Sequence, residues 1–189
     1  MGIELSMEVK DIIQRMVEAV KRYHLEMMNT LVLFDTLLLN RLFATSIEAS
    51  SESTLKQIVS KVREVIGNNG LSKQEENKNF NEEVASSEKE TQIFLTCIAQ
   101  TCNAHDVGIR FSQDLAFIFC FAIDRAVEEN REEVTYEDIV NSFIENLSKS
   151  LLEIFFDFEI NSSEFKKNYQ GAIEEKVGKF KIPTALVGC

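Results

Sequence analysis

The sequence predicts an all-α fold of six or seven helices, and three observations support this. The chain of 189 residues contains one proline and seven glycines, whereas a sheet of any size needs more turn residues than that. Hydrophobic residues make up 44% of the chain, which is enough to form a core. Apolar residues recur at helical spacing along most of its length.

The longest apolar run, residues 115–123, predicts the central helix. This run is too short to cross a bilayer, which requires about 20 apolar residues. A surface helix would carry a single apolar stripe, so we expect residues 112–129 to form a helix that the other helices bury on most of its circumference. A buried β-strand is the alternative for such a run, but the polar flanks and the lack of turn residues favour a helix.

The remaining helices follow from apolar periodicity and from capping residues. Ser6 is expected to cap the first helix, and Thr135 with Asp138 forms an approximate capping box. The N-terminal Met-Gly-x-x-x-Ser also matches the loose pattern for myristoylation of Gly2, for which capping by Ser6 is the alternative. Residues 25–44 are either a second helix after a bend or a continuation of the first. The expected helices cover residues 7–24, 25–44, 54–66, 88–103, 112–129, 135–158 and 163–179.

The length of the chain suits a single domain, which we place at residues 1–180. The charged segment 71–89 is predicted to be a flexible, solvated loop, and a lid that folds on a partner is the alternative. Residues 181–189 are predicted to be a loosely held C-terminal tail.

The formal net charge of −11 disfavours partners that are themselves anionic. Nucleic acid and anionic membrane surfaces reward clusters of lysine and arginine, and the sequence contains no basic stripe. We expect no membrane span and a cytoplasmic protein. Its four cysteines are expected to be reduced, buried thiols: Cys97, Cys102, Cys120 and Cys189.

The sequence carries no arrangement that indicates an enzyme. It contains no P-loop, no nucleophile elbow and no Gly-rich dinucleotide motif. Its histidines are His24 and His105, which are too few for a metal centre of the His-Asp phosphohydrolase or ferritin type. Cys102 and His105 are spaced as helical neighbours, which rarely form a nucleophile pair. We therefore expect a non-enzymatic protein without a bound metal.

Two local patterns resemble known families. Residues 121–143, with the sequence Glu-Val-Thr-x-x-Asp-Ile inside them, resemble the helix-loop-helix of histone folds and of ATPase lid domains. This pattern is chiefly a capping signal, and the acidic charge argues against the DNA wrapping of a histone.

The second resemblance covers more of the chain and preserves the order of the helices of a globin. Residues 39–49 look like the second globin helix and the corner after it, and residues 91–107 look like the proximal helix. Residues 54–66, 112–129 and 135–158 would be the fifth, penultimate and last helices. The sequence departs from the globin pattern at the haem site, because Cys102 stands at the position of the proximal histidine and Ile47 replaces the corner proline. His105 could bind haem only in a shifted register.

A globin-like domain without haem resembles the sensor modules of bacterial stress signalling. That resemblance implies a dimer and an apolar chamber for a fatty-acid-like ligand. The residues that could line such a chamber are Leu33, Leu37, Val62, Phe94, Ile98, Phe117, Phe121, Phe143 and Leu147. For each of these residues, a place in a close-packed core is the alternative.

These observations lead to three functional expectations. The first is a non-enzymatic, globin-like sensor or regulatory domain that binds an apolar ligand, a second copy or a protein partner through its helices. The second is a haem protein that binds gas or transfers electrons through His105. The third is a helical interaction or structural protein without a small ligand, with an exposed apolar patch on residues 27–43.

Overall fold

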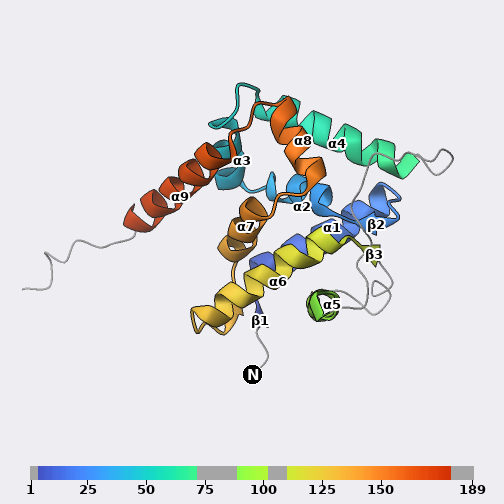
Figure 1. Cartoon of the computed structure of the whole chain (residues 1–189), viewed down its shortest axis with the longest axis vertical. Helices are drawn as coiled ribbons and strands as arrows, with labels where there is room; N and C mark the ends of the chain where they lie inside the picture. Colours follow the sequence, from blue (N-terminus) through green and yellow to red (C-terminus); the bar gives the residue numbers. More distant parts are fainter. Residues whose placement is uncertain (1–3, 72–88, 102–109, 180–189) are drawn as a thin grey trace, which may run out of the picture.

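A computed structural model describes residues 4–71, 89–101 and 110–179, and it confirms the all-α prediction (Figure 1). Nine helices and four very short strands lie within these three ranges. The helices are α1 (Met7–Arg22), α2 (Thr30–Leu37), α3 (Arg41–Glu48), α4 (Leu55–Leu71), α5 (Lys89–Thr101), α6 (Gln113–Glu128), α7 (Tyr136–Glu145), α8 (Lys149–Asp157) and α9 (Ser162–Lys179). The strands are β1 (Glu4–Leu5), β2 (Met27–Met28), β3 (Arg110–Phe111) and β4 (Glu133–Val134).

The chain uses one local pattern twice. A strand, a capped helix, a left-handed residue, a second strand and a second capped helix cover residues 4–37 (the first copy) and again residues 110–143 (the second copy). Equivalent positions are 106 residues apart, from Glu4 and Arg110 onwards. The left-handed residues are His24, with φ of 51°, and Asn130, with φ of 56°. The sequence analysis did not detect this repeat.

The strands join the two copies to each other. Strand β1 pairs in parallel with β4, with Glu4 opposite Glu133, and β2 pairs in parallel with β3, with Met27 opposite Arg110. The first strand of each copy therefore pairs with the second strand of the other. Exchanging the copies converts one pairing into the other, which is the relationship that an approximate two-fold axis produces.

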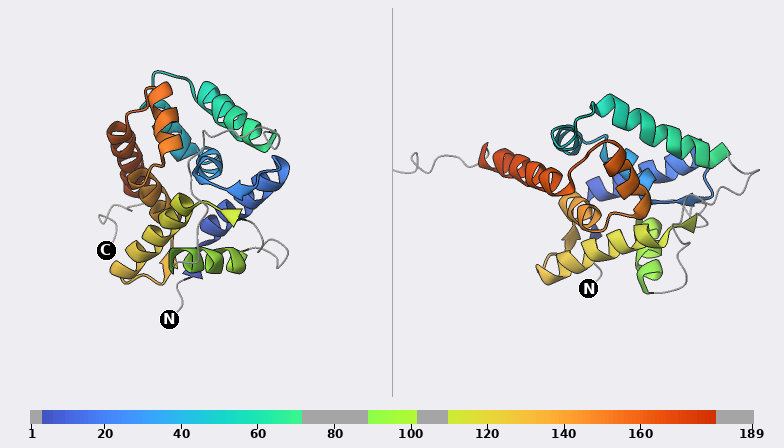
Figure 2. Two further views of the ribbon diagram at one scale, coloured as in Figure 1. Left: turned by 45° about the vertical axis from the view of Figure 1, so that its right-hand side comes forward. Right: turned by 45° about the horizontal axis from the view of Figure 1, so that its top comes forward.

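Helix α2 is the central element of the core. All eight of its residues are buried, and in Figure 2 the helix lies between α4 and α6. The ring of Phe34 lies 5.7 Å from Phe143 and from Phe155 and 6.1 Å from Phe43. The prediction that other helices bury residues 112–129 on most of the helix circumference is wrong. Helix α6 buries one side against its neighbours and leaves Phe121 48% exposed on the other.

Two expected helices are each divided by a cap. Residues 25–44 form β2, α2 and part of α3, and α2 and α3 meet at an angle of 100°. Residues 135–158 form α7 and α8, because the Ser148 side chain accepts a hydrogen bond from the Leu151 amide at 3.4 Å and starts a new helix. The Ser148 hydroxyl also bonds the Thr30 hydroxyl at 2.7 Å, which ties this break to the core helix.

The predicted loop, the C-terminal tail and the possible haem ligand cannot be compared with the structure. Residues 72–88, 181–189 and His105 lie outside the described ranges. Helix α4 continues to Leu71, beyond the predicted end of this helix at residue 66. The single-domain boundary at residue 180 stays a prediction.

Within the described ranges, no helix is by itself long and apolar enough to span a membrane. Only α2 and α3 taken together satisfy that length and composition test, and they do so across their sharp bend.

Candidate functional site

The residues predicted to line an apolar chamber lie in different places. Five of them are buried in the core: Leu33, Leu37, Val62, Ile98 and Phe143. Phe117 and Leu147 are half-buried, and Phe121 is exposed. The side chain of Phe94 lies outside the described part of the chain, as does the whole of His105. None of the eight whose side chains the structure describes lines either of the two clefts discussed below.

Phe117 and Phe121 form an aromatic pair on the outer face of α6. They are one helical turn apart, and their ring centroids are separated by 6.5 Å. The equivalent positions in the first copy are Asp11 and Arg15, which form an ion pair of 2.7 Å on the exposed face of α1. A solvated helix face is normally polar, so the second copy carries an apolar surface where the first carries an ordinary charged one. We call Phe117 and Phe121 the α6 aromatic pair.

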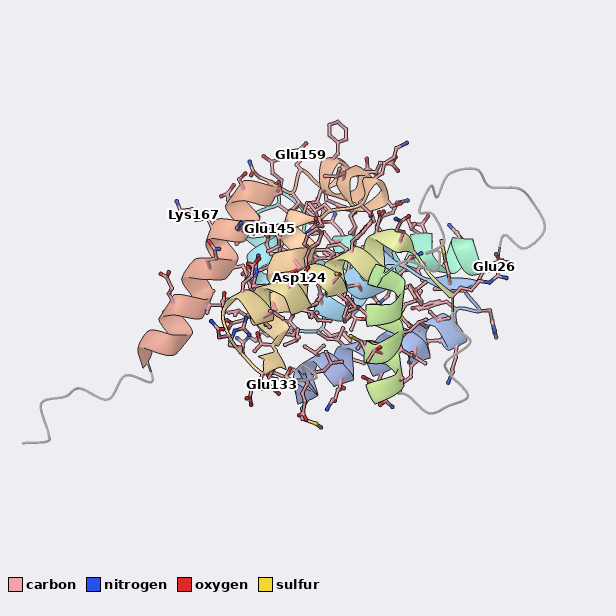
Figure 3. All side chains as sticks on the ribbon, turned by 60° about the horizontal axis from the view of Figure 1, so that its bottom comes forward. Glu26, Asp124, Glu133, Glu145, Glu159 and Lys167 are labelled. Atoms are coloured by element: carbon pink, nitrogen blue, oxygen red, sulfur yellow. The ribbon has the colours of Figure 1, made fainter. Side chains whose placement is uncertain are left out.

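A larger apolar surface lies where α8 turns into α9. A cleft of about 660 Å³ there is lined by Leu152, Phe155, Phe156, Asp157, Glu159, Ile160, Asn161 and Ser162. Phe156 is 83% exposed and Leu152 is 52% exposed, and their spacing of four residues places them on the same face of α8. Phe155 and Ile160 are buried beneath them. We call this feature the α8–α9 cleft; Figure 3 labels Glu159 at this turn.

Hydrogen bonds hold the turn of the α8–α9 cleft in place. Glu159 adopts a left-handed conformation with φ of 52°, and the Ile160 amide donates to the Phe155 carbonyl at 2.7 Å. Together these are the features of a helix end of the Schellman type. The Ser51 hydroxyl donates to the Phe158 carbonyl at 2.6 Å.

A second anchor follows directly after that turn. The Asn161 amide donates to the Ser50 carbonyl at 3.1 Å, and the Asn168 side chain donates to the Ser50 hydroxyl at 3.0 Å. Both anchors come from the segment between α3 and α4, so the cleft is formed before any ligand binds.

A smaller cleft of about 230 Å³ lies between α1, the α2–α3 turn and the start of α7. Its charged residues are Glu8, Asp11 and Arg15, and Arg15 is already paired with Asp11. Tyr136 forms part of the wall, and its hydroxyl oxygen is buried. Burial raises the pKa of Tyr136 far above its ordinary value, so this phenol stays protonated.

The described residues show no arrangement for metal binding or thiol chemistry. No group of three or more His, Cys, Asp or Glu side chains among them could hold a metal ion. Cys97 and Cys120 are buried, and burial raises the pKa of Cys97 to about 12. At neutral pH Cys97 is therefore a thiol rather than the reactive thiolate. Cys102 and Cys189 lie outside the described ranges.

Sequence reasoning missed both exposed surfaces for identifiable reasons. The run 115–123 was interpreted as buried all round, although Phe117 and Phe121 are spaced by one turn and could have shared an outward face. Phe156 follows the buried Phe155 in the chain, and adjacent helical residues point in different directions, which is the signal that could have separated them.

Comparison with known proteins identifies the fold. No protein-family model and no curated protein sequence matches the chain. Among solved structures, the N-terminal domain of Hsp104 from Candida albicans is similar, with a TM-score of 0.60 and 13% identity over 92% of this chain and 91% of that one. The N-terminal domain of the caseinolytic protease associated chaperone ClpD from Arabidopsis thaliana is also similar, with a TM-score of 0.56 and 14% identity over 90% of this chain and 95% of that one.

These similarities correct the globin interpretation. The described helices follow the fold of the two chaperone N-terminal domains and not that of a globin sensor domain. The match to globins rested on the order of helices and on apolar positions that any helical bundle would share. The expected fatty-acid sensor and the haem role of His105 are therefore withdrawn as well, because both depended on the globin register. The fold of this chain is that of the N-terminal domains of Hsp104 and ClpD.

Proposed function

We propose that this chain is a non-catalytic, polypeptide-binding domain of the kind that serves a chaperone, and that its partner is an unfolded or flexible segment of a substrate or adaptor protein. The observation that carries the proposal is the shared fold, which extends over about nine-tenths of this chain and of each of two chaperone N-terminal domains.

The α6 aromatic pair supports this proposal and supplies a first binding surface. Exposed aromatic side chains contribute large contact areas to protein interfaces. The equivalent positions on α1 show that the fold does not require apolar residues there, because Asp11 and Arg15 occupy them as an ion pair. Phe121 and the uncovered part of the half-buried Phe117 are thus available for binding.

Recognition of an unfolded chain needs exposed apolar surface and no reacting group, and both the α6 aromatic pair and the α8–α9 cleft supply such a surface.

The experiment compares two forms of one protein. Fluorescently labelled lysozyme is reduced and carboxamidomethylated so that it stays unfolded and keeps its positive charge, and its binding is measured by anisotropy against that of native lysozyme. We expect the unfolded form to bind and the native form to bind far more weakly, since only the former exposes apolar segments. Equal binding of the two forms, or no binding of either, would contradict the proposal.

A matched pair of variants tests the surface. Phe117→Asp with Phe121→Arg installs on α6 the ion pair that α1 already carries, so the net charge is unchanged. We expect weaker binding of unfolded lysozyme. Val127→Ser, at a 54% exposed position elsewhere on the same helix, is the control and should bind like the unchanged protein.

A further inference from the structure

We propose that the α8–α9 cleft is a second binding site, separate from the α6 aromatic pair, and that it selects polypeptide segments in which large apolar residues are flanked by lysine or arginine. This inference rests on the proposed polypeptide-binding function and specifies the chemistry of the partner.

The apolar part of the cleft is suited to hold side chains. Phe156 and Leu152 stand at its mouth, 83% and 52% exposed, whereas Phe155 and Ile160 beneath them are only 4% and 6% exposed. An incoming apolar side chain would cover surface that water now contacts, and the hydrophobic effect favours that burial. The volume of about 660 Å³ is in the range of small-molecule pockets, and it is large enough for a few side chains of a peptide.

The charge of the cleft determines which apolar segments bind. Asp157 and Glu159 are among its eight lining residues, and none of the eight is lysine, arginine or histidine. The C-terminal end of α8 and the N-terminal end of α9 both reach the cleft, and each helix end carries roughly half a charge, of opposite sign. These two partial charges cancel to a first approximation, so two full carboxylate charges remain.

Cations are therefore favoured beside the apolar floor. The net charge of −11 for the chain extends this preference to longer range, because it attracts basic segments during their approach.

The geometry of the cleft is set before binding. The hydrogen bonds from Ser51 to Phe158, from Asn161 to Ser50 and from Ile160 to Phe155 fix the turn that forms its wall. A preformed site loses little conformational entropy when a ligand binds. Only the ligand and the exposed rings of the mouth need to become ordered.

Charge also argues against other occupants. In a symmetric dimer through this face, Asp157 and Glu159 of the two copies would approach each other, and like charges repel. A fatty-acid carboxylate would meet the same repulsion. A basic and apolar polypeptide segment satisfies both the floor and the rim.

The test uses the full 189-residue chain and two short synthetic peptides that share a Leu-Phe-Leu core. One peptide is flanked by lysines and the other by glutamates, and binding is measured by fluorescence anisotropy. We expect the lysine peptide to bind at least about tenfold more tightly, and the difference to shrink as salt is added, because salt screens exposed charges. Equal binding of the two peptides would overturn the charge selection.

Variants show which surface of the protein binds the lysine peptide. Phe156→Ser should weaken binding of the lysine peptide about tenfold, a typical loss for a central aromatic contact. Asp157→Asn with Glu159→Gln should strongly reduce the preference for lysine and leave only the long-range attraction of the remaining net charge. The control, Val127→Ser at a 54% exposed position on α6, should leave that preference intact. Because Phe156 is exposed, its replacement should not unfold the domain, which urea unfolding verifies.

Other outcomes separate this inference from the proposed function. If Phe117→Asp with Phe121→Arg loses the lysine preference and Phe156→Ser keeps it, the cleft is not the site, although polypeptide binding stands. If the chain dimerises and Phe156→Ser abolishes the dimer, the occupant is a second copy and the inference fails. If the lysine peptide binds while unfolded lysozyme does not, the broader proposed function fails and the cleft remains a peptide site.

Discussion

Arg131 holds the carboxylate of Asp138 with two nitrogens, at 2.6 and 2.7 Å, and this contact links the turn after α6 to the first turn of α7. The same carboxylate accepts hydrogen bonds from the Thr135 amide at 2.7 Å and from its hydroxyl at 2.8 Å. The side chain of Asp138 is only 5% exposed. In the first copy the equivalent positions are Leu25 and Val32, so one copy is apolar where the other is ionic.

Replacing Asp138 by asparagine should destabilise the protein. The change leaves the Arg131 guanidinium without its charged partner and removes an acceptor from the helix cap. We expect a loss of about 2–3 kcal/mol, below the values for fully buried pairs because Arg131 is 30% exposed. Urea unfolding measures this loss in the free energy of unfolding. The control is Asp11→Asn, which breaks an exposed pair with Arg15 and should cost less than about 1 kcal/mol.

The same contact predicts lower stability in acid. Burial by itself would raise the pKa of Asp138, but the hydrogen bonds from Arg131 and Thr135 outweigh it and lower that pKa. A carboxyl whose pKa is lower in the folded state stabilises the fold above its unfolded pKa of about 3.9, and that contribution is lost as the pH falls through the lower, folded value. We therefore expect the urea midpoint to drop below about pH 4.

The urea midpoint of the Asp138→Asn protein should fall less steeply over the same pH interval, because one of the titrating groups is gone. It should not become insensitive to pH, since the hydrogen bond from Lys166 and the charge of Arg125 also lower the pKa of Glu145. Parallel curves for the two proteins would contradict the assignment to Asp138.

The two copies predict matched effects at their caps. Ser6 accepts a hydrogen bond from the Val9 amide at 3.2 Å, and Ser112 accepts one from the Leu115 amide at 3.3 Å. Ser6→Ala and Ser112→Ala should each lower the free energy of unfolding by about 1 kcal/mol, because each leaves a first-turn amide without its partner. Ser163→Ala, at an exposed position in α9, is the control and should have little effect. A large difference between Ser6 and Ser112 would show that the copies are not equivalent.

Tyr136→Phe should stabilise the protein. The Tyr136 hydroxyl is buried and has no hydrogen-bond partner in the part of the chain that the structure describes. An unsatisfied buried polar group costs about 1–3 kcal/mol, so removing the oxygen should raise the free energy of unfolding by about 1 kcal/mol. The half-buried Tyr23 supplies the control, and its change to phenylalanine should be close to neutral. A destabilised Tyr136→Phe protein would mean that the hydroxyl has a partner.

Phe43→Leu should weaken the aromatic cluster of the core. The Phe43 ring lies 5.1 Å from Phe165, 6.0 Å from Phe143 and 6.2 Å from Tyr169. A smaller, non-aromatic side chain leaves a gap among these rings, and we expect a loss of about 1–2 kcal/mol in urea unfolding. Phe156→Leu is the matched control and should stay within about 0.5 kcal/mol, because Phe156 is 83% exposed. Similar losses for both would contradict the assigned core.

Local signals in the sequence predicted the helices well and the arrangement of the helices poorly. The Ser6 cap and the capping box of Thr135 and Asp138 are confirmed, because capping depends on residues only a turn apart. The break at Ser148 was missed, since apolar periodicity continues across it, although serine is a strong capping residue. The exposed positions Phe121 and Phe156 could not be separated from the core by residue type alone.

The global fold could not be obtained from those signals. The repeat becomes visible only when residues 4–37 are aligned with residues 110–143, and apart from the caps and the apolar pattern the two copies share few residues. Val32 and Asp138 illustrate why, because equivalent positions in the two copies have opposite chemistry. A helix order compatible with globins was therefore easy to find, and the structural comparisons corrected the globin interpretation that followed from it.

The crossed strand pairing has a consequence for synthesis on the ribosome. Glu4, near the start of the chain, is opposite Glu133, and Met27 is opposite Arg110. The first copy leaves the ribosome with both of its strand edges unpaired, and they stay so until residues 110–134 have emerged. Contacts between such distant residues close late and slow folding. During that interval the nascent chain exposes unpaired strand edges, which are templates for pairing with another chain.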